Sequence, residues 1–151
     1  MHPFSLQVVI DCTSPHELAD WWAETLGWQV EPQDESFIRK MIAKGFASED
    51  ETTVHCGALV WKSATAVRPV EPTGAAQPRL LFQHVPETKS VKNRVHLDLR
   101  PDRTGEDGFD SAAYRQWLLD RGATVVGGGQ QGSHRWVTMS DPEGNEFCID
   151  E

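Results

Sequence analysis

The sequence predicts an α+β fold in which a β-α-β-β-β unit occurs twice. In each half an apolar strand precedes a helix that has a polar cap at its start and a glycine at its end, and a second strand follows the helix. Each half then continues into two further strand patterns separated by turn residues. Identity between the halves is weak, so the predicted duplication depends on the order of the elements. The 151 residues suit one ordinary domain.

The first half contains a well-marked helix between its first two strands. Ser14-Pro15-His16-Glu17 supplies an N-cap, a proline at the first helical position and a glutamate three residues after the cap, and Gly27 is placed as a stop. His16 is expected at the surface. The strands predicted in this half span residues 6–12, 28–31, 56–66 and 79–85.

The segment 34–51 is extra to this pattern. Phe37, Met41 and Ile42 have helical spacing, which predicts a short helix. The acidic run Ser48-Glu49-Asp50-Glu51 after it is expected to be a solvated loop.

The second half repeats the order of elements. Asp110 or Ser111 can cap a helix that Gly122 ends. Gly127-Gly128-Gly129 is predicted to turn the chain, and Asp141-Pro142-Glu143-Gly144-Asn145 has strong turn chemistry. The strands predicted here span residues 93–100, 123–126, 134–139 and 146–150.

The strand predicted over 93–100 points to a functional site. Its residues alternate between apolar and polar, so one side faces a core and the other is polar. The expected core face carries Val95, Leu97 and Leu99, and the opposite face carries Arg94, His96, Asp98 and Arg100. An imidazole and a carboxylate lined up on one strand face suggest a binding or catalytic site.

Composition limits the classes of function. A formal net charge of −9 argues against general affinity for nucleic acid, because the chain has no basic surplus to displace phosphate counterions. No apolar run approaches the ~20 residues of a membrane span, and no signal segment is recognised, so we expect a cytoplasmic protein without a membrane partner. Three cysteines without a CxxC motif are expected to be reduced thiols.

Several short motifs, in this order, resemble a known superfamily: Val9-Ile10-Asp11-Cys12, Trp21-Trp22 with Leu26-Gly27-Trp28, Leu80-Leu81-Phe82-Gln83, His96-Leu97-Asp98-Leu99, and Asp141-Pro142-Glu143-Gly144-Asn145-Glu146-Phe147-Cys148. The chain resembles the glyoxalase-like branch of the vicinal-oxygen-chelate (glyoxalase/bleomycin resistance/dioxygenase) superfamily over nearly its whole length except roughly 34–51. The resemblance implies a single domain over 1–151, with module one at about 5–88, an insertion near 34–51, and module two at about 92–151. The paired modules would curl an eight-stranded sheet into a cup with the helices outside, and a homodimer is expected.

The same resemblance implies where the site lies. Active members bind a divalent metal with one side chain from the first and last strand of each module, and the corresponding residues here are Gln7, Gln83, His96 and Cys148. Cys148 stands where metal-binding members usually have a glutamate. The two glutamines offer only neutral amide oxygens, which are weak ligands for a transition metal. We therefore expect no tightly held catalytic metal. If zinc, nickel or manganese binds, these four residues are the candidate ligands, and Asp98 or Asp11 could complete the set.

Three hypotheses follow. The first is a small-molecule binding protein whose ligand contacts come from Gln7, Gln83, His96, Asp98, Cys148 and Trp136. The second is a metal-dependent lyase or isomerase of glyoxalase type, with His96 as the catalytic candidate. The third is a structural or interaction role with an idle cup. A plain alternative for His96 is a hydrogen bond to Asp98, Gln83 or Gln7 without further function.

Overall fold

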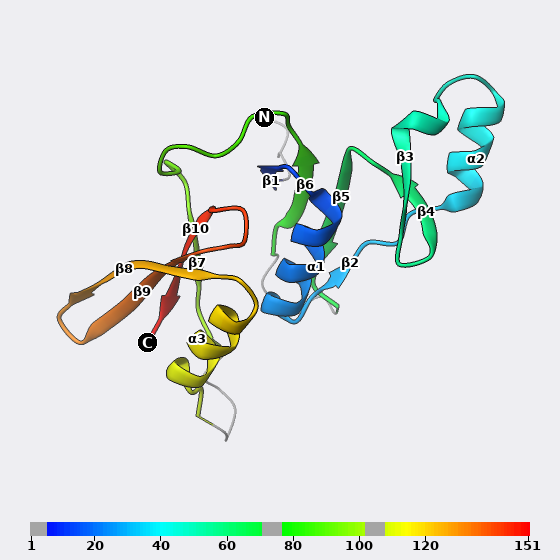
Figure 1. Cartoon of the computed structure of the whole chain (residues 1–151). Coiled ribbons are helices and arrows are strands. Elements are labelled where there is room, and N and C mark those ends of the chain that lie inside the picture. Colours follow the sequence, from blue (N-terminus) through cyan, green and yellow to red (C-terminus); the bar gives the residue numbers. More distant parts are fainter. Residues whose placement is uncertain (1–5, 71–76, 102–107) are drawn as a thin grey trace, which may run out of the picture. The chain divides into compact units, whose positions relative to one another are not determined.

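The computed structural model describes residues 6–70, 77–101 and 108–151 (Figure 1). The chain divides into two compact units, Met1–Thr88 and Lys89–Glu151. Each unit has its own helix-covered sheet. None of the helices in the described ranges is both long and apolar enough to cross a membrane.

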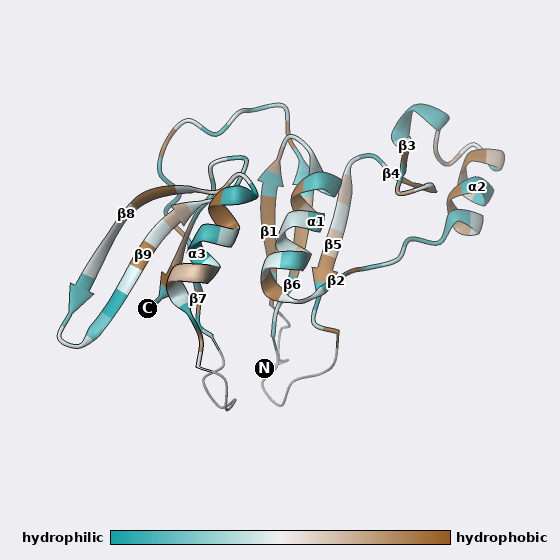
Figure 2. Cartoon of the chain, turned by 60° about the horizontal axis from the view of Figure 1, so that its bottom comes forward, coloured by the Kyte–Doolittle hydropathy of each residue, from teal (hydrophilic) through white to brown (hydrophobic). Residues whose placement is uncertain are grey.

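The first unit contains one complete β-α-β-β-β set. Its elements are β1 (Gln7–Cys12), α1 (Pro15–Leu26), β2 (Gln29–Val30), β5 (Ala64–Arg68) and β6 (Arg79–His84). The sheet order is β1-β6-β5-β2, with β1 parallel to β6 and the other pairs antiparallel. In Figure 2 strand β1 is largely hydrophobic in colour, and α1 packs on β5 and β6. The core between α1 and this sheet includes Leu18, Trp22, Val67, Leu80 and Phe82.

Helix α1 forms as its sequence predicts. Ser14 occupies the N-cap position, its carbonyl accepts a hydrogen bond from the Leu18 amide at 3.0 Å, and Pro15 is the first helical residue. Gly27 ends the helix with φ 64°, a left-handed conformation that glycine adopts without a steric penalty. The predicted surface position of His16 is wrong, because its side chain is packed and only 6% of the residue is exposed.

The additional segment of the first unit is larger than expected. It comprises α2 (Glu35–Ala43), the 3-10 turn η1 (Glu49–Glu51), β3 (Thr52–His55) and β4 (Ala58–Trp61), and the two strands form a separate antiparallel hairpin. The prediction of one continuous strand over 56–66 is therefore wrong. Cys56 and Gly57 have φ values of 49° and 82° and reverse the chain between β3 and β4. The predicted short helix is present as α2.

The second unit repeats the topology of the first. Its elements are β7 (Leu97–Leu99), α3 (Ser111–Asp120), β8 (Thr124–Gln131), β9 (His134–Ser140) and β10 (Glu146–Asp150). The order β7-β10-β9-β8, with β7 parallel to β10, matches β1-β6-β5-β2 strand for strand. Asp110 caps α3 by accepting a hydrogen bond from the Ala113 amide at 3.0 Å. The predicted α+β fold with a duplicated β-α-β-β-β unit is confirmed.

Two details of the second unit differ from expectation. The glycines at 127–129 lie inside β8 rather than in a turn, and the chain reverses at Gly132, which has φ 62°. Strand β7 is shorter than 93–100, so His96 directly precedes it. Val95 is 77% exposed and does not join the core face formed by Leu97 and Leu99.

Candidate functional site

One face of the β7-β10-β9-β8 sheet carries polar side chains. The register pairs Asp98 of β7 with Cys148 of β10, and Cys148 with Thr138 of β9. On these strands successive side chains alternate between faces, so the neighbours Phe147 and Ile149 point the other way and are almost fully buried. This alternation defines the polar face, which we take as the candidate site.

His96, Asp98 and Cys148 gather on the polar face. An imidazole nitrogen, a carboxylate oxygen and the thiol sulfur of these residues all lie within 4.8 Å of one another. The His96 Nε2 atom is 3.4 Å from Asp98 Oδ1, and both side chains are roughly half exposed. Cys148 is buried, and its sulfur lies 3.4 Å from the Thr138 hydroxyl. The structure thus brings together three of the residues that the sequence indicates.

Trp136 lies in the next row of the same face. The register places it between Asp150 of β10 and Gly129 of β8. Its indole occupies the space beside Gly129, and its ring centroid is 5.5 Å from that of His134. His134 Nε2 lies 3.6 Å from the Asp150 carboxylate. An aromatic surface therefore adjoins the polar row of His96, Asp98 and Cys148.

A hydrogen-bonded latch holds the segment that leads to His96. The Glu146 carboxylate accepts hydrogen bonds from Lys89 Nζ at 2.9 Å and from the Asn93 amide at 3.0 Å. Burial raises the pKa of the Glu146 carboxyl, but these hydrogen bonds outweigh burial and hold the pKa below its ordinary value. No local sequence pattern indicates these hydrogen bonds, because Lys89 lies 57 residues before Glu146.

The two glutamines indicated by the sequence belong to the first unit. Gln7 accepts a hydrogen bond from Arg79 Nη1 at 2.5 Å, and Arg79 also pairs with Glu31. Gln7 is opposite Arg79 in the register, whereas Gln83 is opposite Asp11. The two positions are four residue steps apart along the extended strand, on the order of 13 Å. They share a sheet face but do not lie side by side, and their place in one site with His96 stays a prediction.

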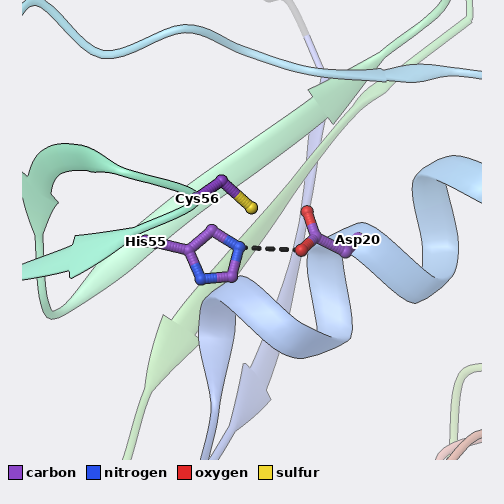
Figure 3. Close-up of side chains that lie close together, drawn as sticks. All are labelled: Asp20, His55 and Cys56. Atoms are coloured by element: carbon purple, nitrogen blue, oxygen red, sulfur yellow. Dashed lines mark hydrogen bonds and ion pairs between the residues drawn. The ribbon is translucent and has the colours of Figure 1, made fainter.

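A second group of potential ligands lies in the first unit and was missed by the sequence analysis. Asp20 of α1, His55 of β3 and Cys56 of the following turn place their side-chain ligand atoms within 4.8 Å of one another (Figure 3). Asp20 is separated from His55 by 35 residues. The one local sequence signal of this group is the pair Cys56-Gly57 directly after His55.

Both units have the β-α-β-β-β topology, and the second presents a polar sheet face. The family model described as "Glyoxalase-like domain" matches residues 7–149, and the chain belongs to this family. No curated protein matches the sequence.

Solved structures share the fold at low sequence identity. A mutant of the fosfomycin resistance protein FosX from Listeria monocytogenes, complexed with Mn(II) and a dihydroxypropylphosphonic acid, is 6% identical with a TM-score of 0.60, covering 99% of this chain and 92% of that chain. The bleomycin resistance determinant encoded on the transposon Tn5 is 12% identical with a TM-score of 0.52, covering 99% and 98%. An antibiotic binding protein from a Streptomyces species is 18% identical with a TM-score of 0.51, also covering 99% and 98%.

Proposed function

We propose that this protein binds a small organic molecule on the polar face of its second sheet. The observation that carries the proposal is the position of Trp136. Its indole is fixed against Gly129, on the face that also presents His96, Asp98 and Cys148. Ligand sites typically combine an aromatic or apolar surface with a few placed polar groups, which is the arrangement found here.

We also propose that residues 1–151 form one glyoxalase-like domain, in which the two units are the paired modules that the resemblance implies. Support comes from the solved structures named above, which align with at least 99% of the chain and so extend over both units. Gln7 and Gln83, which share a face of the first unit's sheet, are proposed as further hydrogen-bonding groups for a ligand.

The relatives suggest which ligands to test first. The names of three structural neighbours refer to fosfomycin resistance, bleomycin resistance and antibiotic binding. We therefore propose an antibiotic-like or other aromatic molecule as the ligand. We propose a cytoplasmic location, in line with the reduced thiols that the sequence predicts. We also propose a homodimer, which light scattering on the purified protein would test.

A thermal-shift panel of aromatic and antibiotic-like compounds tests the binding proposal. At least one compound should raise the melting temperature of the wild type. The same compound should lose most of its effect in Trp136→Ala and in Asp98→Asn. Trp117→Ala is the matched control, because Trp117 lies on α3 and contacts Tyr114 and Arg121 rather than a residue of the polar face, and it should leave the shift unchanged. Silence across the panel, or an equal shift in Trp136→Ala, contradicts the proposal.

A metal-dependent lyase or isomerase is the second candidate function. The close grouping of imidazole, carboxylate and thiol on His96, Asp98 and Cys148 favours it. This donor set suits zinc better than manganese, which prefers oxygen ligands. The three side chains would hold the ion, which when bound would act as a Lewis acid on a substrate oxygen. With His96 bound to the ion, a carboxylate would move the proton, and His96 would act as the base only in a metal-free version of this candidate.

Elemental analysis separates the two candidates. It should be made on Cys56→Ser protein, so that the cluster at Asp20 does not contribute metal. The enzyme hypothesis expects about one metal ion per chain that is lost in His96→Ala, together with stabilisation by added zinc, nickel or manganese. No retained metal and no stabilisation would remove this candidate.

A further inference from the structure

We infer that Asp20, His55 and Cys56 form a zinc site that joins the β3–β4 hairpin to helix α1. Asp20 lies in the second turn of α1, His55 ends β3, and Cys56 is the first residue of the turn. Figure 3 shows the three side chains converging between the helix and the turn. All three residues belong to the first unit, and the inference does not depend on the proposed ligand site.

The distances suit a tetrahedral ion after small side-chain rotations. The His55 Nε2 atom is 2.7 Å from Asp20 Oδ2, and the Cys56 sulfur completes a group within 4.8 Å. With the usual zinc bond lengths, ligand atoms in a tetrahedral site lie roughly 3.3–3.7 Å apart. The nitrogen and oxygen would therefore separate slightly, and the sulfur would need to move only a short way.

The chemistry of the three donors also matches zinc. One imidazole, one carboxylate and one thiolate are all established zinc ligands, and the two anionic groups would balance the charge of a divalent ion. Asp20 is 42% exposed and Cys56 is exposed, so an ion can reach the site from solvent. Three protein ligands leave a fourth position for water or an external ligand.

The backbone of Cys56 gives independent support. Cys56 has φ 49° and is the only non-glycine residue in the described part of the chain with a positive φ. Cys56 and Gly57 are the two central residues of the hairpin turn, where positive φ values favour Asn-Gly or Gly-Gly. A cysteine is an unfavourable choice for that conformation, and turn formation alone does not explain it. Metal ligation does, because the turn directs the sulfur toward Asp20 (Figure 3).

A buried neighbour orients the histidine ligand. The ring of His16 stacks on that of His55, with centroids 4.8 Å apart, and His16 Nε2 lies 2.9 Å from the Trp61 carbonyl oxygen. His16 and Asp20 are four residues apart on α1 and so share one face of the helix. Both the carboxylate and the imidazole are thus positioned by the same helix. Stacking of this kind limits the motion of the His55 ring.

Cobalt loading of the full-length protein tests the inference. The protein is stripped with a chelator and titrated with cobalt(II) chloride alone, because a cobalt–thiolate bond gives a strong near-ultraviolet absorption. We expect about one cobalt ion per chain at this site, displaced by zinc. The absorption should persist in Cys148→Ser, which removes the thiol of the cluster on the polar face, and should disappear when Cys56→Ser is added to that variant. His55→Ala removes a ligand and should weaken cobalt binding more than about 100-fold. Loss of a residue that only hydrogen-bonds a metal ligand already costs roughly 10–100-fold.

The variant Cys56→Gly is the control for a loss of cobalt binding that misfolding would cause. Glycine tolerates positive φ, so this variant should fold and, without metal, melt at or above the wild-type temperature. It should nevertheless fail to develop the cobalt absorption. The inference is overturned if the wild type shows no thiolate band. It is overturned equally if the band survives when Cys56→Gly is combined with Cys148→Ser, or if Cys148→Ser alone abolishes the band.

Discussion

The indole of Trp136 occupies the space that a side chain on Gly129 would need. A Cβ atom built on Gly129 would lie 2.3 Å from Trp136 Cζ2 and 2.7 Å from Cε2. Alanine at this position would therefore push the indole off the strand. We expect Gly129→Ala to lower the free energy of unfolding by about 1–3 kcal/mol, which is typical of overpacking, and to shift the tryptophan fluorescence. Denaturant unfolding measures the change.

Gly127 supplies the matched control for this prediction. It lies on the same strand, but a Cβ there would meet no atom within 4 Å. Gly127→Ala should change stability by no more than about 1 kcal/mol, in either direction. An equal loss in both variants would show that β8 needs its glycines for a reason other than contact with Trp136.

The Lys89–Glu146 pair predicts a loss of stability in acid. Its side chains are 18% and 10% exposed, and the pKa of Glu146 lies below its ordinary value of 4.5. Folding therefore favours the ionised carboxylate of Glu146. Its contribution to stability is present above about pH 4.5 and is lost as the pH falls through the pKa of Glu146 in the folded protein. Glu146→Gln should cost about 1–3 kcal/mol near neutral pH, with the difference from wild type shrinking toward pH ~3.

Urea unfolding at several pH values checks this prediction. Glu35→Gln is the control, because Glu35 also has a lowered pKa through its hydrogen bond from Arg39 but lies at the surface of α2. Exposed pairs contribute little to stability, so the pH dependence of this variant should stay close to that of the wild type. A Glu146→Gln variant that kept the wild-type acid sensitivity would contradict the role of the latch.

Local signals made much of this fold predictable. Helix α1 begins at Pro15 and ends before Gly27 because the capping residues determine both ends within a few positions. The turn between β3 and β4 was missed because Cys56-Gly57 lacks the usual Asn-Gly composition. The glycines of β8 were misassigned because their role depends on Trp136, which lies on the neighbouring strand.

The difference between local signals and contacts of distant residues also explains which parts of the sites could be predicted. His96 and Asp98 were found together because they are two residues apart along one extended segment. Cys148 joins them through the pairing of β10 with β7, which the resemblance to a known family implied. Asp20 and His55 could not be paired from the sequence, because their contact depends on how the inserted hairpin packs on α1.

We expect substitution of the turn residue Asp141 to lower the free energy of unfolding strongly. It is 2% exposed, and its Oδ1 atom accepts hydrogen bonds from the backbone amides of Glu143 and Asn145 at 3.0 and 2.9 Å. Asp141→Ala removes the acceptor and should cost about 2–3 kcal/mol in thermal or chemical unfolding. Asp110→Ala, which removes one exposed capping bond at α3, should cost only about 1 kcal/mol. A larger loss of stability in Asp110→Ala than in Asp141→Ala would contradict this account of the turn.

Tyr114 provides a spectroscopic test of packing around α3. Burial raises the pKa of its phenol from 10.0 to about 12, and its ring stacks on that of Trp117 at 5.7 Å. The neutral phenol is favoured in the folded protein, so this contribution to stability is full below pH 10 and is lost as the pH rises through about 12. Tyr114 is the single tyrosine of the chain, so the ultraviolet absorbance of phenolate reports on it alone. Titration of the native protein should show a midpoint near 12, and Trp117→Ala should move it toward 10, because the phenol is then better hydrated. A native midpoint near 10 would show that the ring is open to solvent.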